Sequence, residues 1–243
     1  KLDHAEALMD AGLVEEAEEL LCAALDDARK SDHVLDVGDI LLDLARCAVV
    51  RQDSEHARTR AGEAAEAFGA RQADSRQALA ELFLAGVDLA DGRSADAALA
   101  AAARWRTPDP HSAEEVEATL IGAEAEVLAG HPDRARQELA RLKKTATLRL
   151  PVRIHEHYLR ALVAHETGDD AGFAAAARTA SEGLTAAQSM VQSLELRAAI
   201  AQHAVRLAQL DLGRSVGSGS AAAFIDTIER WRAASARARE LTI

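Results

Sequence analysis

Apolar positions recur along this chain with the period of an α-helix, in runs of roughly 15 residues that short turns separate. Glycine marks most of these turns, at Gly12, Gly92, Gly130 and Gly168. The segment 51–54 supplies an equivalent turn midway between the first two, with Gln52 in the glycine position. Successive turns are then 40, 40, 38 and 38 residues apart. A constant spacing of this length predicts a repeated helix–turn–helix unit.

Helix boundary signals agree with this period. A capping box, Ser112 with Glu115, follows the breaker segment 107–110 and predicts a helix start. Pro132 stands where a first-turn proline is tolerated, and residues 213–220, rich in Gly and Ser, predict a flexible linker. The predicted helix pairs are 1–11 with 13–29, 33–51 with 54–69, 74–91 with 94–106, 113–129 with 132–143, 151–167 with 170–184, and 188–212 with 221–238.

Alanine recurs at fixed places relative to the turns. Seven residues before each turn stand Ala5, Ala45, Ala85, Ala123 and Ala161. Five residues after it stand Ala17, Ala57, Ala97 and Ala135, with Phe173 in the fifth unit. Twelve residues after it stand Ala24, Ala64 and Ala180, while Arg104 and Leu142 interrupt the series. Small residues let antiparallel helices approach closely, and one pair cannot bury its apolar face alone, so we expect the pairs to stack into a solenoid.

The composition favours the same fold class. Hydrophobic residues make up 49% of the chain but aromatic residues only 3%, whereas strands prefer β-branched and aromatic residues. Alanine, leucine, glutamate and arginine are strong helix formers. The chain is too hydrophobic for a disordered class, and no run of 18 apolar residues predicts a membrane span. We therefore expect an all-α protein with no membrane partner.

The net charge of −12 argues against nucleic acid as a partner, because phosphate binding needs a basic surface. The charge is uneven: residues 1–70 hold 7 basic and 17 acidic side chains, and the other residues hold 21 and 23. The segment 229–240 is locally basic. These charges indicate either ordinary solvated helix faces or an acidic and a basic end that meet different neighbours.

Residues 5–24, AEALMDAGLVEEAEELLCAA, resemble a tetratricopeptide (TPR) repeat in their small residues and turn glycine. The resemblance covers about residues 1–184 and implies a TPR-like α-solenoid, a right-handed superhelix of about six helix pairs. The repeats here exceed the usual length of about 34 residues. Arg104 and Leu142 replace the small residue of the second helix, which puts close pairing there in doubt.

A narrower resemblance concerns the C-terminal part. Residues 193–198, a long helix through Leu212 and the segment 228–233, IERWRA, resemble the helices before the CHAT domain of actinobacterial TPR–CHAT proteins. CHAT domains are caspase-like proteases, so the resemblance implies a repeat region that controls such a protease in the parent chain. The chain starts without Met and stops ten residues after Ala233, which we interpret as a fragment of a longer protein.

No catalytic or metal-binding constellation emerges from the sequence. Cys22 and Cys47 lie within helical runs, outside any metal-ligand spacing, and are interpreted as reduced packing thiols. His155 and His157 point to different sides of a helix, unlike the i, i+4 histidines of zinc helices. The Gly217–Gly219 run lacks the lysine of a phosphate loop. We expect no enzyme activity, no cofactor and no metal.

Two tryptophans near helix ends allow two interpretations. Trp105 and Trp231 either pack in the core or cap a helix end, or they form contact hot spots for a protein partner.

The remaining candidate site is a groove. In TPR-type solenoids the first helix of each pair lines the concave face, which implies a peptide or protein groove. Its candidate residues are Arg46, Val49, Leu82, Leu89, Glu117, Leu120, Glu124, Val127, His155, Tyr158, Leu162 and His165.

The predicted function is a non-catalytic interaction or regulatory scaffold, whose partner is a protein, a peptide or the parent protein's own missing domain. The alternatives are a ligand-sensing region of a bacterial transcriptional regulator, an enzyme, and a stand-alone adaptor. No signal peptide is recognisable, so we expect a cytoplasmic protein.

Overall fold

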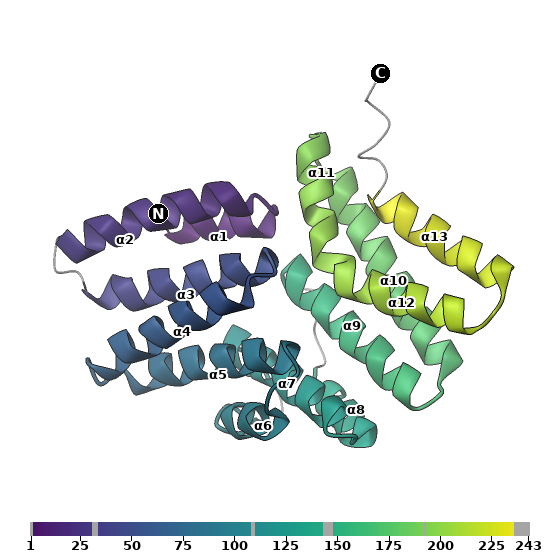
Figure 1. Cartoon of the computed structure of the whole chain (residues 1–243), viewed down its shortest axis with the longest axis horizontal. Coiled ribbons are helices and arrows are strands. Elements are labelled where there is room, and N and C mark those ends of the chain that lie inside the picture. The colour runs from purple at the N-terminus through teal and green to yellow at the C-terminus, as the bar shows by residue number, and fades with distance from the viewer. Residues whose placement is uncertain (1, 31–33, 108–109, 143–147, 192, 236–243) are drawn as a thin grey trace. The chain divides into compact units, whose positions relative to one another are not determined.

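The chain is all-helical in the part that the structure describes, and its helices pack in adjacent pairs (Figure 1). The computed structural model describes residues 2–30, 34–107, 110–142, 148–191 and 193–235. Two compact units emerge: unit 1 comprises 1–9 and 13–142, and unit 2 comprises 10–12 and 143–243. The predicted all-α class is confirmed, while the superhelical stacking and the single domain remain predictions.

The helices of unit 1 follow the predicted pairs closely. They are α1 Leu2–Asp10, α2 Val14–Lys30, α3 Val34–Val50, α4 Ser54–Gly69, α5 Asp74–Ala90, α6 Ala95–Ala103, α7 Ala113–Leu128 and α8 Pro132–Leu139. The predicted capping box opens α7, since Ser112 accepts from the Glu115 amide and Glu115 accepts from the Ser112 amide. Residues 1, 33 and 143, at predicted helix ends, lie outside the described residues.

Unit 2 departs from the prediction at its last pair. Its helices are α9 Leu150–Glu166, α10 Asp170–Ser189, α11 Leu194–Ala201, the 3₁₀ turn η2 Gln202–Ala204, α12 Val205–Gly217 and α13 Ala221–Ser235. The single helix predicted at 188–212 is wrong, because α10 extends to Ser189 and η2 interrupts the next run. The predicted end of the last helix, 236–238, is not among the described residues.

The linker predicted at 213–220 is also wrong over most of its length. Helix α12 continues through Gly217, supported by the hydroxyls of Ser215 and Ser218, which donate to carbonyl oxygens one turn earlier. The connection to α13 is therefore a short turn in which Gly219 has a φ of 67°. Arg214 becomes part of a helix face rather than of a loop.

The repeated turns share a left-handed backbone residue. Gly12, Gly92, Gly130 and Gly168 have φ angles between 69° and 81°, a region that glycine adopts without steric penalty. Gln52 has a φ of 60° in the same place, although it carries a side chain. The assignment of Gln52 as the equivalent turn position is thus confirmed.

The alanine series seven residues before the turns is buried, at 9% exposure or less in every unit. The series five residues after the turns is buried in four units, but Ala97 is exposed and Ala98 is fully buried. The reason is one extra turn residue: α6 begins three residues after Gly92, whereas α2 begins two residues after Gly12. The predicted place of Ala97 is therefore wrong by one residue.

The second helices of the third and fourth pairs are short. Helix α6 ends at Ala103 and α8 at Leu139, so both stop before the places where Ala24 and Ala64 lie buried in α2 and α4. Because α6 begins one residue later after its turn, the equivalent position in the third pair is residue 105, which is a tryptophan. The bulk of this side chain explains why the close helix contact does not continue there.

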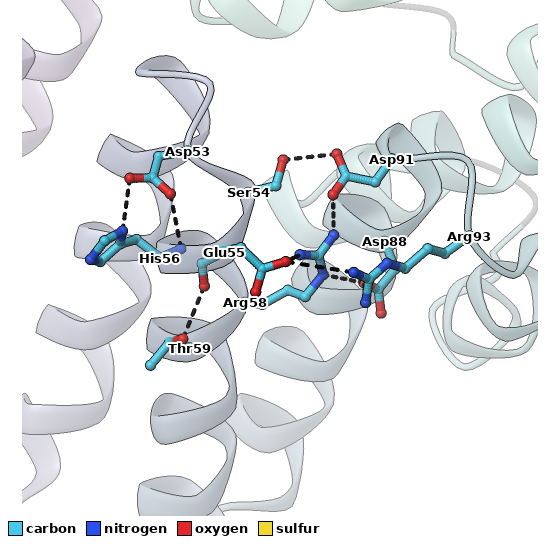
Figure 2. A network of polar contacts seen from close by, with 9 residues as sticks. All are labelled: Asp53, Ser54, Glu55, His56, Arg58, Thr59, Asp88, Asp91 and Arg93. Carbon is cyan, nitrogen blue, oxygen red and sulfur yellow. Dashed lines mark hydrogen bonds and ion pairs between the residues drawn. The ribbon is translucent and has the colours of Figure 1, made fainter.

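A polar network links the second and third pairs of unit 1 (Figure 2). Nε of Arg58 lies 2.6 Å from Oδ1 of Asp88, and its other nitrogens contact Asp91 and Glu55. The hydroxyl of Ser54, at the start of α4, donates to Asp91 across 2.8 Å at the end of α5. The network therefore connects the turn at Gln52 to the turn at Gly92.

Candidate functional site

Helix α9 packs against α10 and α12 in unit 2. Ile154 and Leu159 are buried in the core. His155, Tyr158 and His165 lie on neighbouring sides of α9, since helix positions three and ten apart are within about 80° of each other. Tyr158 is half-buried and packs against the core, whereas His165, two turns further along, is exposed. Helix α12 packs against α9. We call the surface that comprises His155, Tyr158, His165, Arg206 and Arg214 the α9–α12 groove, which is hollowed at its end next to His165 and Arg214.

One end of the α9–α12 groove holds a cation–aromatic pair. The guanidinium of Arg206, on α12, lies 4.3 Å from the ring centroid of Tyr158. Its Nη2 donates to the Tyr158 hydroxyl across 3.1 Å. The ring of His155 lies 6.3 Å from that of Tyr158 in a stacked arrangement. Cations bind the faces of electron-rich rings in this geometry.

A second pair of the same kind lies two helical turns further along. Arg214 lies 4.3 Å from the ring centroid of Phe173, and it pairs with the exposed carboxylate of Asp170. The ring of His165 meets Phe173 edge-on, with centroids 6.4 Å apart. Arg206 and Arg214 are eight residues apart on α12, which corresponds to about 12 Å along the helix axis.

A surface depression of about 580 Å³, open to the solvent, lies beside Arg214 of this second pair. Its lining residues are His165, Gln209, Leu210, Gly213, Arg214, Gly217 and Ser218. A Cβ atom added at Gly213 or Gly217 would have no neighbour within 4 Å, so no side chain covers the backbone at these two glycines. The volume falls within the range of roughly 300–1,000 Å³ that is typical of ligand sites.

The charge of the segment 143–243 contrasts with that of the whole chain. Residues 143–243 contain 13 basic and 10 acidic side chains, whereas residues 1–142 contain 15 and 30. The segment 143–243 is therefore net positive as a sequence although the chain carries −12, but its described residues hold 9 basic and 9 acidic side chains.

Several predicted groove residues of unit 1 do not face outward. Leu82 and Leu89 are at most 1% exposed and lie in the core between α5, α6 and α7, so their assignment to a groove is wrong. Glu124, Leu120 and Val127 are also buried within α7. Helices pack on both sides of α5 and α7, so only a narrow strip of the surface of each helix faces the solvent.

Arg46 and Glu117, two predicted groove residues of unit 1, interact electrostatically. Arg46 is half-buried on α3, where it binds Asp43 at 2.7 Å and lies 6.0 Å from the ring centroid of Phe83. Desolvation lowers the pKa of Arg46, but the carboxylates of Glu117 and Asp43 outweigh it, so the pKa is raised overall. Arg46 and Glu117 thus lie close together, while Val49 is exposed on the same helix.

The sequence did not point to Arg206, Arg214 or Phe173. Arg206 and Arg214 fit one helix face at i and i+8, but that helix was expected to end at Leu212. Phe173 stood only as an irregular member of an alanine series. The signal was present in the spacing of the two arginines, and the mistaken linker concealed it.

The two cysteines differ in environment. Cys47 is fully buried, and desolvation raises the pKa of its thiol to about 12. Cys22 is exposed on α2, so the expectation of a buried packing thiol is wrong there. A cysteine nucleophile must be accessible and deprotonated. The thiol of Cys47 is buried, and its raised pKa keeps it protonated. Within the described ranges, no group of three or more His, Cys, Asp or Glu side chains is arranged to hold a metal ion.

Trp231 belongs to the core of unit 2. It is 6% exposed, and its Nε1 donates to Oδ2 of the buried Asp211 across 2.9 Å. Arg230 binds the same carboxylate at 2.5 Å. The core interpretation of Trp231 is therefore confirmed, and the side chain fixes α13 on α12.

Comparison with protein-family models, with curated proteins and with solved structures finds no match to this chain. None of the helices in the described segments combines the length and the apolar character of a membrane span.

Proposed function

We propose that this chain is a non-catalytic interaction scaffold whose α9–α12 groove binds an acidic segment of a protein partner. The observation that carries this proposal is the pair of arginines, Arg206 and Arg214, each placed over an aromatic ring along one groove. The rings hold the guanidinium groups in fixed positions, which reduces the conformational entropy lost on binding. Arginine forks bind carboxylates in two-point geometry.

The spacing of the arginines favours a peptide over a single small anion. About 12 Å separates them along α12, which is roughly the distance between residues eight apart on a helix or four apart in an extended strand. Tyr158, His165 and Leu210 add apolar and aromatic surface between and beside the charges. Such mixed surfaces suit a segment with acidic and apolar side chains.

Fluorescence anisotropy with a fluorescein-labelled, glutamate-rich helical peptide tests the proposal. We expect the double variant Arg206→Gln/Arg214→Gln to bind the peptide at least about tenfold more weakly, because two charge-assisted hydrogen bonds are lost. The matched control is Arg178→Gln/Arg232→Gln, which removes the same charge from exposed arginines elsewhere in unit 2. We expect the control to bind within about twofold of the parent chain.

Two results contradict the groove. Equal weakening by both double variants means that the peptide responds to net charge alone. Undiminished binding by the Arg206→Gln/Arg214→Gln variant places the recognition elsewhere. Circular dichroism of each variant verifies that the helical content is unchanged.

The finer function that we propose is a TPR-like superhelix that controls a caspase-like CHAT module of the parent chain. Its support is the resemblance of residues 193–233 and the buried alanine before each turn. Phe224, Ile225 and Ile228 of α13 are between 37% and 57% exposed and offer an apolar face for such a module. Trp231 would couple that face to α12.

The coding sequence on either side of residues 1–243 tests this finer proposal. A His/Cys protease module after Ile243 supports it. A helix-turn-helix module before Lys1 or after Ile243 contradicts it and favours the sensing region of a transcriptional regulator instead.

A further inference from the structure

The turn after α5 contains the only Asp–Gly step in the chain, Asp91–Gly92. An aspartate before a glycine is chemically labile. In the first step the glycine amide nitrogen attacks Cγ of the aspartate, so that a C–N bond forms and the carboxyl OH leaves as water with the amide proton. In the second step one water opens the succinimide ring by cleaving one of its two C–N bonds. The products are aspartate and isoaspartate, and the reaction needs no reactant besides water.

The surroundings of this turn leave room for the reaction. Residues 91–94 are exposed, and a Cβ atom added at Gly92 would have no neighbour within 4 Å. Water and a five-membered ring can therefore be accommodated beside the backbone. At the turns of Gly12, Gly130 and Gly168 the preceding residue is alanine or threonine, neither of which has a carboxyl group. The lability thus belongs to one turn of the repeated series.

Side chains of α4 hold both oxygens of the Asp91 carboxylate (Figure 2). The Ser54 hydroxyl donates to Oδ1 across 2.8 Å, and Nη2 of Arg58 pairs with Oδ2. These two partners lower the pKa of Asp91, because they stabilise the ionised carboxylate. At neutral pH the succinimide forms from the neutral carboxyl group, whose OH can leave as water. The contacts with α4 therefore oppose the first step.

The attacking nitrogen is also engaged, but only by bonds of the helix end. The Gly92 amide donates to the Leu89 carbonyl across 2.9 Å, and the Arg93 amide donates to the Asp88 carbonyl across 2.9 Å. Hydrogen bonds at the end of a helix open frequently without unfolding of the rest. The contacts of Asp91 with α4 are tertiary, and they persist as long as α4 and α5 are packed together. They are therefore the restraint that depends on the state of the fold.

We propose that Asp91–Gly92 is a site of isoaspartate formation whose rate is controlled by the packing of α4 on α5. While Ser54 and Arg58 bind the carboxylate, the residue stays α-linked. When the two helices separate, the carboxylate is released and the succinimide forms. Isoaspartate adds one carbon to the backbone and attaches the carboxylate directly to Cα, so the modified turn loses its fit to Ser54 and Arg58. The modification thus weakens the contact that prevents it.

Mass spectrometry of the tryptic peptide 77–93 tests this inference after incubation of the chain in neutral buffer at physiological temperature. Isoaspartate has the mass of aspartate, but electron-transfer fragmentation yields ions that distinguish the two and assign the residue. We expect the variant Ser54→Ala/Arg58→Gln to form isoaspartate at residue 91 at least about tenfold faster than the parent chain, because both hydrogen bonds to the carboxylate are lost. Ser54→Ala alone removes one donor and should give an intermediate rate.

The matched control is Arg71→Gln/Ser75→Ala, which makes the same changes in exposed side chains at the opposite end of α4 and α5. It should react within about twofold of the parent chain. In guanidinium chloride all these chains should form isoaspartate at one common, faster rate, because the contact with α4 is then absent. The inference is overturned if Ser54→Ala/Arg58→Gln reacts no faster than the parent chain in buffer, if the control accelerates equally, or if the unfolded parent chain reacts no faster than the folded one.

Discussion

Gln52 occupies a left-handed backbone conformation that four glycines adopt at the equivalent turns. An L-residue with a side chain pays about 1–2 kcal/mol in this region. We therefore expect Gln52→Gly to raise the free energy of unfolding by about 1 kcal/mol. Urea unfolding followed by circular dichroism measures the change.

The control for this substitution is the same exchange within a helix. Gln137 is exposed inside α8, where glycine costs about 1 kcal/mol relative to good helix formers. Gln137→Gly should therefore destabilise the chain while Gln52→Gly stabilises it. Destabilisation by both substitutions is inconsistent with a strained turn at Gln52.

Thiol reactivity should separate the two cysteines. Burial raises the pKa of Cys47 to about 12, so its thiolate is scarce below that pH and its sulfur is inaccessible. We expect a chromogenic disulfide reagent at pH 8 to modify Cys22 rapidly and Cys47 only after urea unfolds the chain. The variant Cys22→Ser should remove the fast phase, and a remaining fast phase contradicts the buried position of Cys47.

Helix α6 shows how one extra turn residue changes the inward face of an element. Ala98 is fully buried and Ala97 is exposed. Ala98→Leu should overpack the contact with α5 and α7 and cost about 1–3 kcal/mol of stability. Ala97→Leu should change stability by less than about 0.5 kcal/mol. Thermal unfolding of both variants measures the difference. A larger loss of stability for Ala97→Leu than for Ala98→Leu would contradict the inward position of Ala98.

The link between α4 and α5 should depend on pH. The Ser54 hydroxyl and then Arg58 lower the pKa of Asp91 below its ordinary value of 3.8. A lowered carboxyl pKa stabilises the fold above the unfolded pKa, and this contribution disappears as the pH falls through the folded pKa. Asp91→Asn should therefore be less stable than the parent chain at pH 7, with the difference shrinking below pH 3.8.

Urea midpoints at pH 7 and at pH 3 measure this dependence. Asp96→Asn, an exposed carboxylate at the start of α6, is the control. A gap between the parent chain and Asp91→Asn that stays constant on acidification contradicts the role of the Asp91 carboxylate.

At the scale of elements, the sequence predicted the regular part of the fold well. Periodic apolar positions, the Ser112 capping box and the turn residues define most helix pairs, because these signals are local. The inward register of α6 and the continuation of α12 through Gly217 were mispredicted. One depends on a single turn residue, and the other on serine hydroxyls and packing that outweigh the local preference of Gly and Ser.

The candidate site was predictable only in part, for a related reason. His155, Tyr158 and His165 share a face of α9 that periodicity alone reveals. Arg206, which contacts Tyr158, and Arg214, which lines the same depression as His165, come from α12, and the position of α12 on α9 is a tertiary property. Leu82 and Leu89 failed as groove residues because neighbouring helices cover both sides of α5.

At the scale of the whole molecule, the two compact units differ in charge. Unit 1 is acidic and is joined by cross-pair networks such as that of Arg58. Unit 2 holds the α9–α12 groove and, among residues 148–191 and 193–235, equal numbers of basic and acidic side chains.

Hydrogen–deuterium exchange with the glutamate-rich peptide tests the central claim, that the α9–α12 groove is the recognition surface. We expect slower exchange in segments 150–166 and 205–217 when the peptide is bound, because the ligand stabilises the two helices against local opening. We expect unchanged exchange in segment 34–90 of unit 1. Protection within 34–90, or no protection in 150–166 and 205–217 at saturating peptide, would contradict this account.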